Sequence, residues 1–314
     1  MLKVGVIGAG SMGKNHARVY AELPEVKLIG IADPNQENVN ELAKIYNTKP
    51  FYNHKDLLGQ APDAVSIVVP TSLHKEVALD TAKAGVNILI EKPIADSPAA
   101  AREIIKAAQK YSLKLMVGHI ERFNPVIPII KKEIAGNDVS LIEITRIGPF
   151  PPRIKDVGVI VDLATHDIDL IRYLTGSEFL KTYSLTAQNF NYHEDVAILL
   201  FEMANGTLAR VTVNWLTPFK VREINIATRE KFIKASLIDQ KVSVYKKFKE
   251  NDSYLVKEKN VSFVEPLKQE LKLFIECIKN NTQPPITGED GLKSLEIAVG
   301  CLNEKDFKMV SCLG

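Results

Sequence analysis

The stretch Glu91-Lys92-Pro93 places a lysine directly after the apolar run 87–90. Open α/β sheets bind their ligands at the carboxyl ends of strands, so a lysine there could hydrogen-bond a substrate hydroxyl beside a cofactor. Pro93 would fix the turn that aims the lysine, and a cis peptide bond is one way to make that turn. The alternative is that Lys92 is an ordinary surface residue, because most lysines are exposed.

A second set of reactive side chains follows at helical spacing. Asp162 and His166 are four residues apart, and Asp169 and Tyr173 continue the same stripe. A histidine there can exchange a proton near neutral pH, and a neighbouring carboxylate can orient it. One alternative is an exposed helix face with an i,i+4 ion pair. Another is a metal site that includes Asp167; because no cysteine and no spaced histidine pair accompanies it, we expect no metal.

Three glycines form a pattern typical of dinucleotide binding. Gly8, Gly10 and Gly13 make a G-x-G-x-x-G loop directly after the apolar run 4–7, and Asp33 follows Gly13 by 20 residues. The glycines permit a tight turn, close approach to a pyrophosphate and close helix packing, while the carboxylate suits ribose hydroxyls. The alternative is a glycine turn that binds no dinucleotide. Asp33 favours NAD, since it would repel the 2′-phosphate of NADP, which stays the alternative cofactor.

The first part of the chain alternates short β-branched runs with amphipathic segments, which predicts βαβ units and a doubly wound parallel sheet. We expect this Rossmann domain, of the α/β class, to occupy residues 1–120. Its predicted strands are 3–7, 26–32, 64–69, 87–90 and 114–117, and its predicted helices are 12–23, 35–46, 74–84 and 97–111.

Longer strand-like runs follow Phe123, after Asn124, Pro125 and Pro128 interrupt the alternation. We expect residues 121–314 to form an α+β domain with an open, mainly antiparallel sheet. Asn205-Gly206 is its strongest hairpin signal. The predicted strands are 141–147, 181–188, 196–202, 207–215, 223–227 and 241–247, and the predicted helices are 162–174, 267–279 and 288–302.

Composition excludes several classes of protein. With 46% hydrophobic and 25% charged residues, and a formal charge of +2, the 314-residue chain lacks the basic excess of a nucleic-acid-binding surface. No apolar run approaches the ~18 residues of a membrane span, and the N-terminus enters a strand directly, so we expect a cytoplasmic protein without a membrane partner. Cys277, Cys301 and Cys312 show neither a disulfide framework nor zinc spacing.

Together the motifs resemble one family. The sequences Gly8-Ala9-Gly10-Ser11-Met12-Gly13, Glu91-Lys92-Pro93, Gly118-His119-Ile120-Glu121-Arg122-Phe123-Asn124-Pro125 and the helix with Asp162 and His166 occur in this order. They resemble the glucose-fructose oxidoreductase, inositol dehydrogenase and rhizopine-catabolism (Gfo/Idh/MocA) family of NAD(P)-dependent oxidoreductases, over essentially the whole chain. The resemblance implies a second domain that carries most substrate contacts and often the subunit interface, hence a homodimer or homotetramer.

The resemblance also implies roles. Lys92 would hydrogen-bond the reacting secondary hydroxyl and help to position the nicotinamide ribose, His166 would be the general base, and Asp162 would orient His166 or bind a neighbouring hydroxyl. For His74, a packing or capping role and a cofactor contact both stay open. The expected cofactor contacts are Gly8, Gly10, Ser11, Met12, Gly13, Asp33, Val69, Pro70, Thr71, His74, Glu91 and Lys92.

The stretch 118–125 bears on the substrate. It is similar to that of the subgroup that oxidises the 3-hydroxyl of nucleotide-linked amino sugars such as UDP-N-acetylglucosamine. Arg122 would meet a phosphate or carboxylate, or else form a salt bridge at the domain junction. An inositol or free-sugar dehydrogenase and a non-catalytic dinucleotide sensor are the alternatives. The expected substrate contacts are Lys92, Arg122, Asn124, Asp162 and His166.

Overall fold

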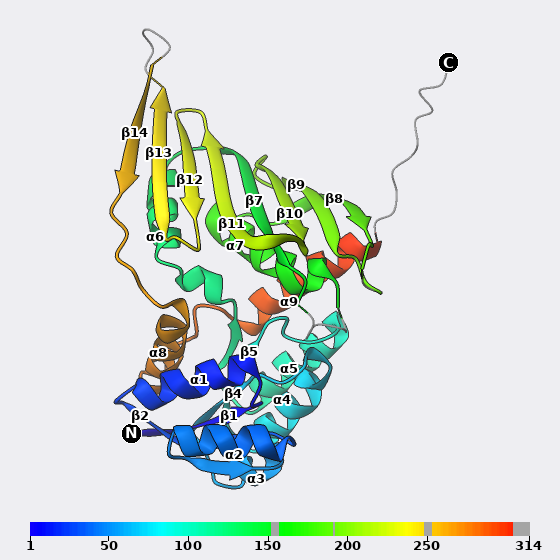
Figure 1. The fold of residues 1–314 in the computed structure, drawn as a ribbon, viewed down its shortest axis with the longest axis vertical. Coiled ribbons are helices and arrows are strands. Elements are labelled where there is room, and N and C mark those ends of the chain that lie inside the picture. Colours follow the sequence, from blue (N-terminus) through cyan, green and yellow to red (C-terminus); the bar gives the residue numbers. More distant parts are fainter. Residues whose placement is uncertain (152–156, 191, 248–252, 304–314) are drawn as a thin grey trace. The chain divides into compact units, whose positions relative to one another are not determined.

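The computed structural model describes residues 1–151, 157–190, 192–247 and 253–303. The chain forms two compact units (Figure 1). The first unit contains Met1–Asn124 and Val264–Leu295, and the second contains Pro125–Phe263 and the end of helix α9 (Gly288–Asn303) from Glu296 onward. Each unit is a separate folded body with its own sheet.

The first unit is built on a six-stranded parallel sheet in the order β3-β2-β1-β4-β5-β6. Its central strands are buried on both faces, as parallel strands covered by helices are. The order reverses beside β1, which creates the switch point where such sheets bind ligands. The strands are β1 (Leu2–Ile7), β2 (Val26–Ala32), β3 (Lys49–Phe51), β4 (Ala64–Ile67), β5 (Asn87–Glu91) and β6 (Leu115–Gly118).

Helices connect these strands close to the predicted positions. Helix α5 starts as expected, because the Ser97 side chain accepts a hydrogen bond from the Ala100 N–H and Pro98 occupies the first turn. Strand β3 and helix α3 were not predicted. The helical segments are α1 (Ser11–Glu22), α2 (Gln36–Ile45), α3 (His54–Leu58), the short turn η1 (Thr71–Leu73), α4 (His74–Lys83), α5 (Pro98–Lys110) and the short turn η2 (Ile120–Phe123).

Helix α8 (Pro266–Lys279) belongs to the first unit, although a single boundary at residue 120 would assign it to the second domain. It lies beside α1 (Figure 1). Leu271 and Phe274 are fully buried, and the guanidinium of Arg18 on α1 pairs with Glu265 just before α8. The apolar face of α8 therefore completes the first unit's core.

The second unit contains an eight-stranded sheet in the order β14-β13-β12-β11-β7-β10-β9-β8. The pairing is antiparallel except between β7 and β10, which run parallel. Strands β12 and β14 were not predicted. The bounds are β7 (Val139–Pro149), β8 (Phe179–Ala187), β9 (Val196–Met203), β10 (Leu208–Asn214), β11 (Leu216–Thr228), β12 (Lys231–Ser236), β13 (Lys241–Lys247) and β14 (Tyr254–Lys259). The prediction of a Rossmann sheet followed by a mainly antiparallel one is confirmed.

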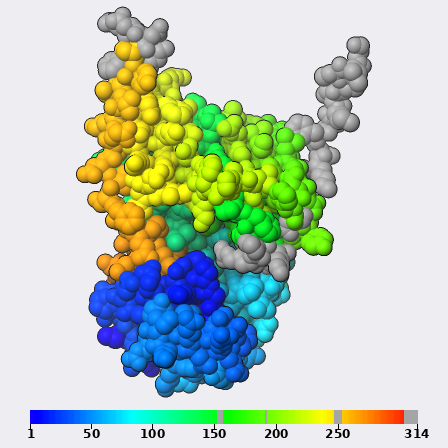
Figure 2. Space-filling model, in the orientation of Figure 1, coloured from blue at the N-terminus to red at the C-terminus, as the bar shows by residue number. Residues whose placement is uncertain are grey.

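Alternating residues of these strands are buried in one core. Helices lie against one face of the sheet (Figure 1). Helix α6 (Val126–Ile134), the π-helical turn η3 (Ile160–Ala164) and helix α7 (Thr165–Thr175) cover that face. In the described part of the chain no helix covers the opposite face, and in Figure 2 the green and yellow strand residues form much of the visible surface of this unit. The sheet is therefore open on one side.

The predicted hairpin at Asn205-Gly206 joins β9 and β10, which pair antiparallel from Val196 opposite Asn214 to Glu202 opposite Leu208. Gly206 takes the positive φ of 85° that the turn requires.

Among the described residues, no helix has the length and apolar character to cross a membrane. Nor do they contain three or more His, Cys, Asp or Glu side chains grouped to hold a metal ion. Cys312 lies outside the described residues.

Candidate active site

The glycine loop joins β1 to α1 at the switch point of the parallel sheet. Gly8 has a φ of +114°, and a Cβ there would stand 2.5 Å from the Val68 carbonyl oxygen. A Cβ on Gly13 would overlap the carbonyl oxygen of Gly8. Both glycines are thus required by the protein's own backbone.

Gly10 differs from these two glycines. A Cβ at this position would meet no protein atom within 4 Å, and its φ of −73° suits any residue. The loop borders a small cavity of about 220 Å³, lined also by Lys14 of α1 and by Asn38 and Glu41 of α2. Because the fold itself does not require a glycine at position 10, the open space there fits a pyrophosphate that approaches the backbone.

Asp33 follows β2 and is tied to the glycine loop. Its Oδ2 atom accepts a hydrogen bond from the Ala9 N–H at 2.6 Å, and its Oδ1 atom accepts one from the Asn35 N–H at 2.8 Å. The carboxylate therefore has a fixed position next to the loop, as binding to adenosine ribose hydroxyls requires. Ser11 is exposed and Met12 half-buried at the start of α1.

The next loop along the sheet runs through Val69, Pro70 and Thr71. His74 begins α4 behind it and is 1% exposed, with Nδ1 2.9 Å from the Pro93 carbonyl oxygen and Nε2 3.0 Å from the Val69 carbonyl oxygen. Burial lowers the pKa of His74, although the carbonyl oxygens and the charge of Glu91 oppose this shift. The buried ring thus bridges the backbones of the two loops that contain Val69 and Pro93.

Glu91 ends β5 and is almost buried. Its Oε1 atom lies 3.1 Å from Nε2 of His16 on α1, and its Oε2 atom accepts the Lys92 N–H at 3.2 Å. Burial would raise the pKa of Glu91, but the hydrogen bond and charge of His16, with the charge of Lys92, outweigh it and lower the pKa. The Lys92–Pro93 bond is cis, as the sequence suggested. The sequence analysis did not identify His16. Its position on the apolar, buried face of α1 was the feature of the sequence that could have drawn attention to it.

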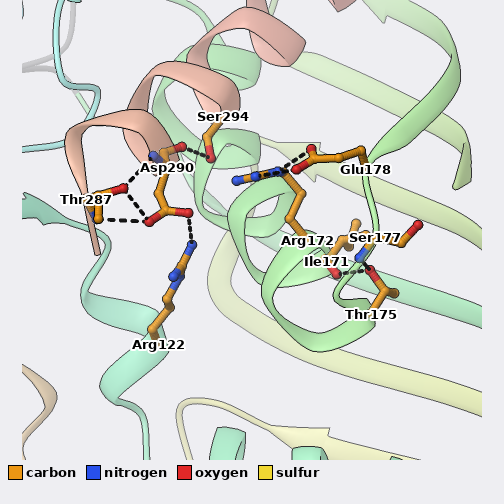
Figure 3. Close-up of polar contacts among 9 residues, drawn as sticks. All are labelled: Arg122, Ile171, Arg172, Thr175, Ser177, Glu178, Thr287, Asp290 and Ser294. Atoms are coloured by element: carbon orange, nitrogen blue, oxygen red, sulfur yellow. Dashed lines mark hydrogen bonds and ion pairs between the residues drawn. The ribbon is translucent and has the colours of Figure 1, made fainter. Parts of the chain in front are cut away.

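Arg122 is an ion-pairing residue in this structure. Its Nη2 atom lies 3.4 Å from Oδ1 of Asp290, whose Oδ2 atom accepts the N–H and the hydroxyl of Thr287, each at 2.9 Å (Figure 3). The Arg122 side chain is only 8% exposed. The salt bridge suggested by the sequence is thus present, with a partner in the same unit. Asn124, another expected substrate contact, is 3% exposed.

Asp162 and His166 belong to the second unit, and both are half-buried. They lie on a helix that begins as the π-helical turn η3 and continues as α7, so the uniform α-helical stripe of the sequence reading starts one turn later than predicted. Glu194 supports this start, because its Oε1 atom accepts the Ile160 N–H at 3.0 Å. A π-helical turn often accompanies a functional position in a helix.

Asp167 and Asp169 on the same helix are buried. Asp167 binds Arg146 of β7, with Arg146 Nε 2.8 and 3.0 Å from the two carboxylate oxygens. Both side chains are at most 1% exposed. Asp167, the carboxylate considered for a metal site, thus forms a buried ion pair with Arg146. The sequence analysis did not identify this pair.

The sequence matches two family models in succession. Residues 2–119 match the oxidoreductase family with an NAD-binding Rossmann fold, and residues 141–233 match the GFO/IDH/MocA C-terminal domain. Both halves of the chain thus point to one family of oxidoreductases, and the predicted nicotinamide cofactor is confirmed at this level.

Individual relatives agree with these models. The UDP-N-acetylglucosamine 3-dehydrogenase of Acidithiobacillus ferrooxidans is 33% identical over 244 residues, covering 78% of this chain and 77% of the relative. A solved structure of that enzyme superposes with a TM-score of 0.89 and 29% identity, covering 95% of this chain and 96% of the other. The scyllo-inositol 2-dehydrogenase (NAD(+)) of Bacillus subtilis is 26% identical, covering 96% of this chain and 93% of the relative.

Proposed function

Since the chain belongs to the Gfo/Idh/MocA family of NAD-binding oxidoreductases, we propose that it oxidises the 3-hydroxyl of a nucleotide-linked amino sugar such as UDP-N-acetylglucosamine. The observation that carries the substrate proposal is the similarity to a UDP-N-acetylglucosamine 3-dehydrogenase in sequence and fold. The stretch 118–125, which resembles that subgroup, supports it.

The first unit fits the dinucleotide. The open space at Gly10 suits the pyrophosphate, and Asp33 suits the adenosine ribose and favours NAD over NADP. The loop at Val69, Pro70 and Thr71 and the turn at Glu91 and Lys92 follow the next two strands at the carboxyl edge where dinucleotides bind. We assign these residues, with Gly8, Ser11, Met12 and Gly13, to the cofactor site, and His74 to the support of its loops.

The protein side chains would handle the proton while the bound nicotinamide accepts the hydride. In this proposal Lys92 donates a hydrogen bond to the reacting hydroxyl and fixes its orientation. His166 accepts the hydroxyl proton as general base, and Asp162 orients His166 or binds a neighbouring hydroxyl. Arg122 and Asn124 contribute to substrate binding, Arg122 by exchanging part of its ion pair with Asp290 for an anionic group of the substrate.

An inositol dehydrogenase is the second candidate, because inositol dehydrogenases of similar length match almost the whole chain. A screen of UDP-sugars, inositols and free aldoses with NAD, followed by NADH absorbance, separates the two. Turnover of UDP-N-acetylglucosamine alone supports the proposal, and turnover of an inositol alone replaces it. Tight NAD binding without turnover of any alcohol would instead favour a non-catalytic sensor.

We also propose that two or four copies assemble through the open face of the second unit's sheet. Register places Tyr183 opposite Leu200 and Leu185 opposite Ile198 on that face, and all four side chains are between 39% and 52% exposed. Adjacent exposed apolar residues of this kind mark association surfaces. Light scattering should give a dimer or tetramer that Leu200→Glu dissociates; a monomeric wild type would refute it.

A further inference from the structure

The carboxylate of Glu91 makes two contacts that bear on Lys92. It accepts the N–H of Lys92 and the ring N–H of His16, since an ionised carboxylate can only accept hydrogen bonds. Glu91 packs closely against Gly118 of β6. A Cβ on Gly118 would lie 3.2 Å from the Glu91 Cα, Cδ and Oε2 atoms. A larger residue at 118 would displace Glu91, so the neighbouring strand is shaped around this side chain.

A second buried carboxyl group interacts electrostatically with Glu91. Glu270 is fully buried on α8, between the apolar residues Leu267 and Leu271, and neither of its oxygens has a hydrogen-bond partner among the described residues. Burial and then the charge of Glu91 raise the pKa of Glu270 well above its ordinary value. The pKa values of the two carboxyl groups are thus shifted in opposite directions, that of Glu91 downward and that of Glu270 upward.

We propose that His16 and Glu91 are positioning residues for Lys92: His16 keeps Glu91 ionised, and the Glu91 carboxylate fixes the turn that presents the lysine. The inference rests on the proposed role of Lys92 in the reaction. A negative charge on Glu270 would oppose the ionised state of Glu91, whereas a neutral Glu270 would not.

The groups that face Glu91 determine how this device responds to pH. His16 on α1 and Lys92 on the adjoining turn favour the ionised form of Glu91. The charge of Glu91 in turn acts on His74 of α4 and on Glu270 of α8. His119 is the residue after Gly118, which pairs with Glu91 in the sheet. As pH falls, protonation of Glu91 weakens the hydrogen bond from the Lys92 N–H, because a neutral carboxyl oxygen is a poorer acceptor than a carboxylate oxygen. Activity should therefore have an acidic limb that depends on His16.

The test compares Glu91→Gln, His16→Leu and His16→Gln with Arg18→Gln as control. The control alters an ion pair on the same helix without touching Glu91. Glu91→Gln should lower kcat about tenfold or more at every pH, because a neutral amide oxygen accepts the Lys92 N–H more weakly than a carboxylate oxygen does, and this fall in kcat should exceed any rise in KM for NAD. His16→Leu should move the acidic limb upward by about one pH unit or more, because burial then dominates the Glu91 pKa.

His16→Gln restores an N–H donor and should return the limb toward that of wild type and of Arg18→Gln. Suppose that Glu91→Gln has the kcat and pH profile of wild type while Lys92→Ala, assayed in parallel, is inactive. That result would overturn the positioning role of Glu91 and spare the proposed function. Full activity in Lys92→Ala would overturn the proposed role of Lys92 instead.

Infrared difference spectra at pH 7 provide a substrate-free measurement and apply even if His16→Leu fails to fold. Glu91→Gln should lose a carboxylate band, and Glu270→Gln should lose the C=O band of a protonated acid. The reverse assignment of the two bands would overturn the inference.

Discussion

Alanine at position 10 and alanine at position 13 should have opposite effects, although both replace a glycine of one loop. At Gly10 the added methyl group meets no protein atom within 4 Å, and the backbone is extended. At Gly13 it overlaps the carbonyl oxygen of Gly8. Because both partners of that overlap are backbone atoms, no side-chain rotation relieves it.

The expected magnitudes follow from these contacts. Gly10→Ala should change the free energy of unfolding by less than about 0.5 kcal/mol, as surface substitutions usually do. Gly13→Ala should cost about 3 kcal/mol, the upper part of the range for overpacking. At roughly 2–4 °C per kcal/mol for a chain of this size, Tm should fall by about 6–12 °C in Gly13→Ala and by at most about 2 °C in Gly10→Ala.

Gly10→Ala, the variant with the smaller expected effect on stability, should have the larger effect on NAD affinity. The methyl group of Gly10→Ala occupies the approach to the pyrophosphate, so Kd for NAD should rise about tenfold or more, equivalent to about 1.4 kcal/mol. Calorimetric titration with NAD, with Tm from circular dichroism of the same samples, measures both effects. Unchanged NAD affinity in a folded Gly10→Ala protein would refute the placement of the pyrophosphate at this loop.

Three further predictions address specificity, chemistry and pH. Asp33→Ser with Pro34→Arg should weaken or reverse a preference for NAD over NADP, measured as the ratio of kcat/KM; tighter NADP binding by wild type would contradict the role of Asp33. Lys92→Ala and His166→Ala should each lower kcat about 10²-fold or more with nearly intact NAD binding, and their losses should be non-additive in the double variant. Full activity of His166→Ala would exclude it as the base. The raised pKa of Glu270 contributes stability below the ordinary glutamate pKa, and that contribution is lost as pH rises toward the folded-state pKa. Glu270→Gln should therefore gain stability over wild type as pH rises from 5 to 9 in urea titrations, and parallel profiles would show that Glu270 is not protonated.

The sequence predicted the first unit well because its signals are local. Strand β2 occupies the predicted residues 26–32, and α4 and α5 begin within one residue of the expected positions. Apolar runs, capping serine and glycine spacing act within a few residues of one another. The same locality explains why the glycine loop and Asp33 could be proposed as a cofactor site before any contact was known.

Helix α6 escaped prediction because its prolines were read as interruptions. Pro125 is the N-cap residue, and Pro128 lies in the first turn of Val126–Ile134. In a first turn the backbone N–H groups have no intrahelical acceptor, so proline removes no hydrogen bond there. Prolines at this spacing therefore favour a helix start as much as a loop.

The buried polar residues could not be assigned without tertiary contacts. His16 and Glu270 each occupy the buried side of a helix, and the spacing of Leu267, Glu270 and Leu271 places the carboxyl group on an apolar stripe. That mismatch was visible in the sequence. Its meaning was not, because Glu91 is 75 residues from His16 and lies on strand β5, whereas His16 lies on helix α1.

The return of α8 to the first unit affects synthesis of the chain on the ribosome. A nascent chain that has emerged only as far as residue 124 already contains every strand of the parallel sheet. It lacks α8, so the side of α1 that α8 later contacts is exposed to water while the second unit is translated. Such an intermediate presents apolar surface to chaperones, and an expression fragment that stops at residue 124 would keep that surface permanently.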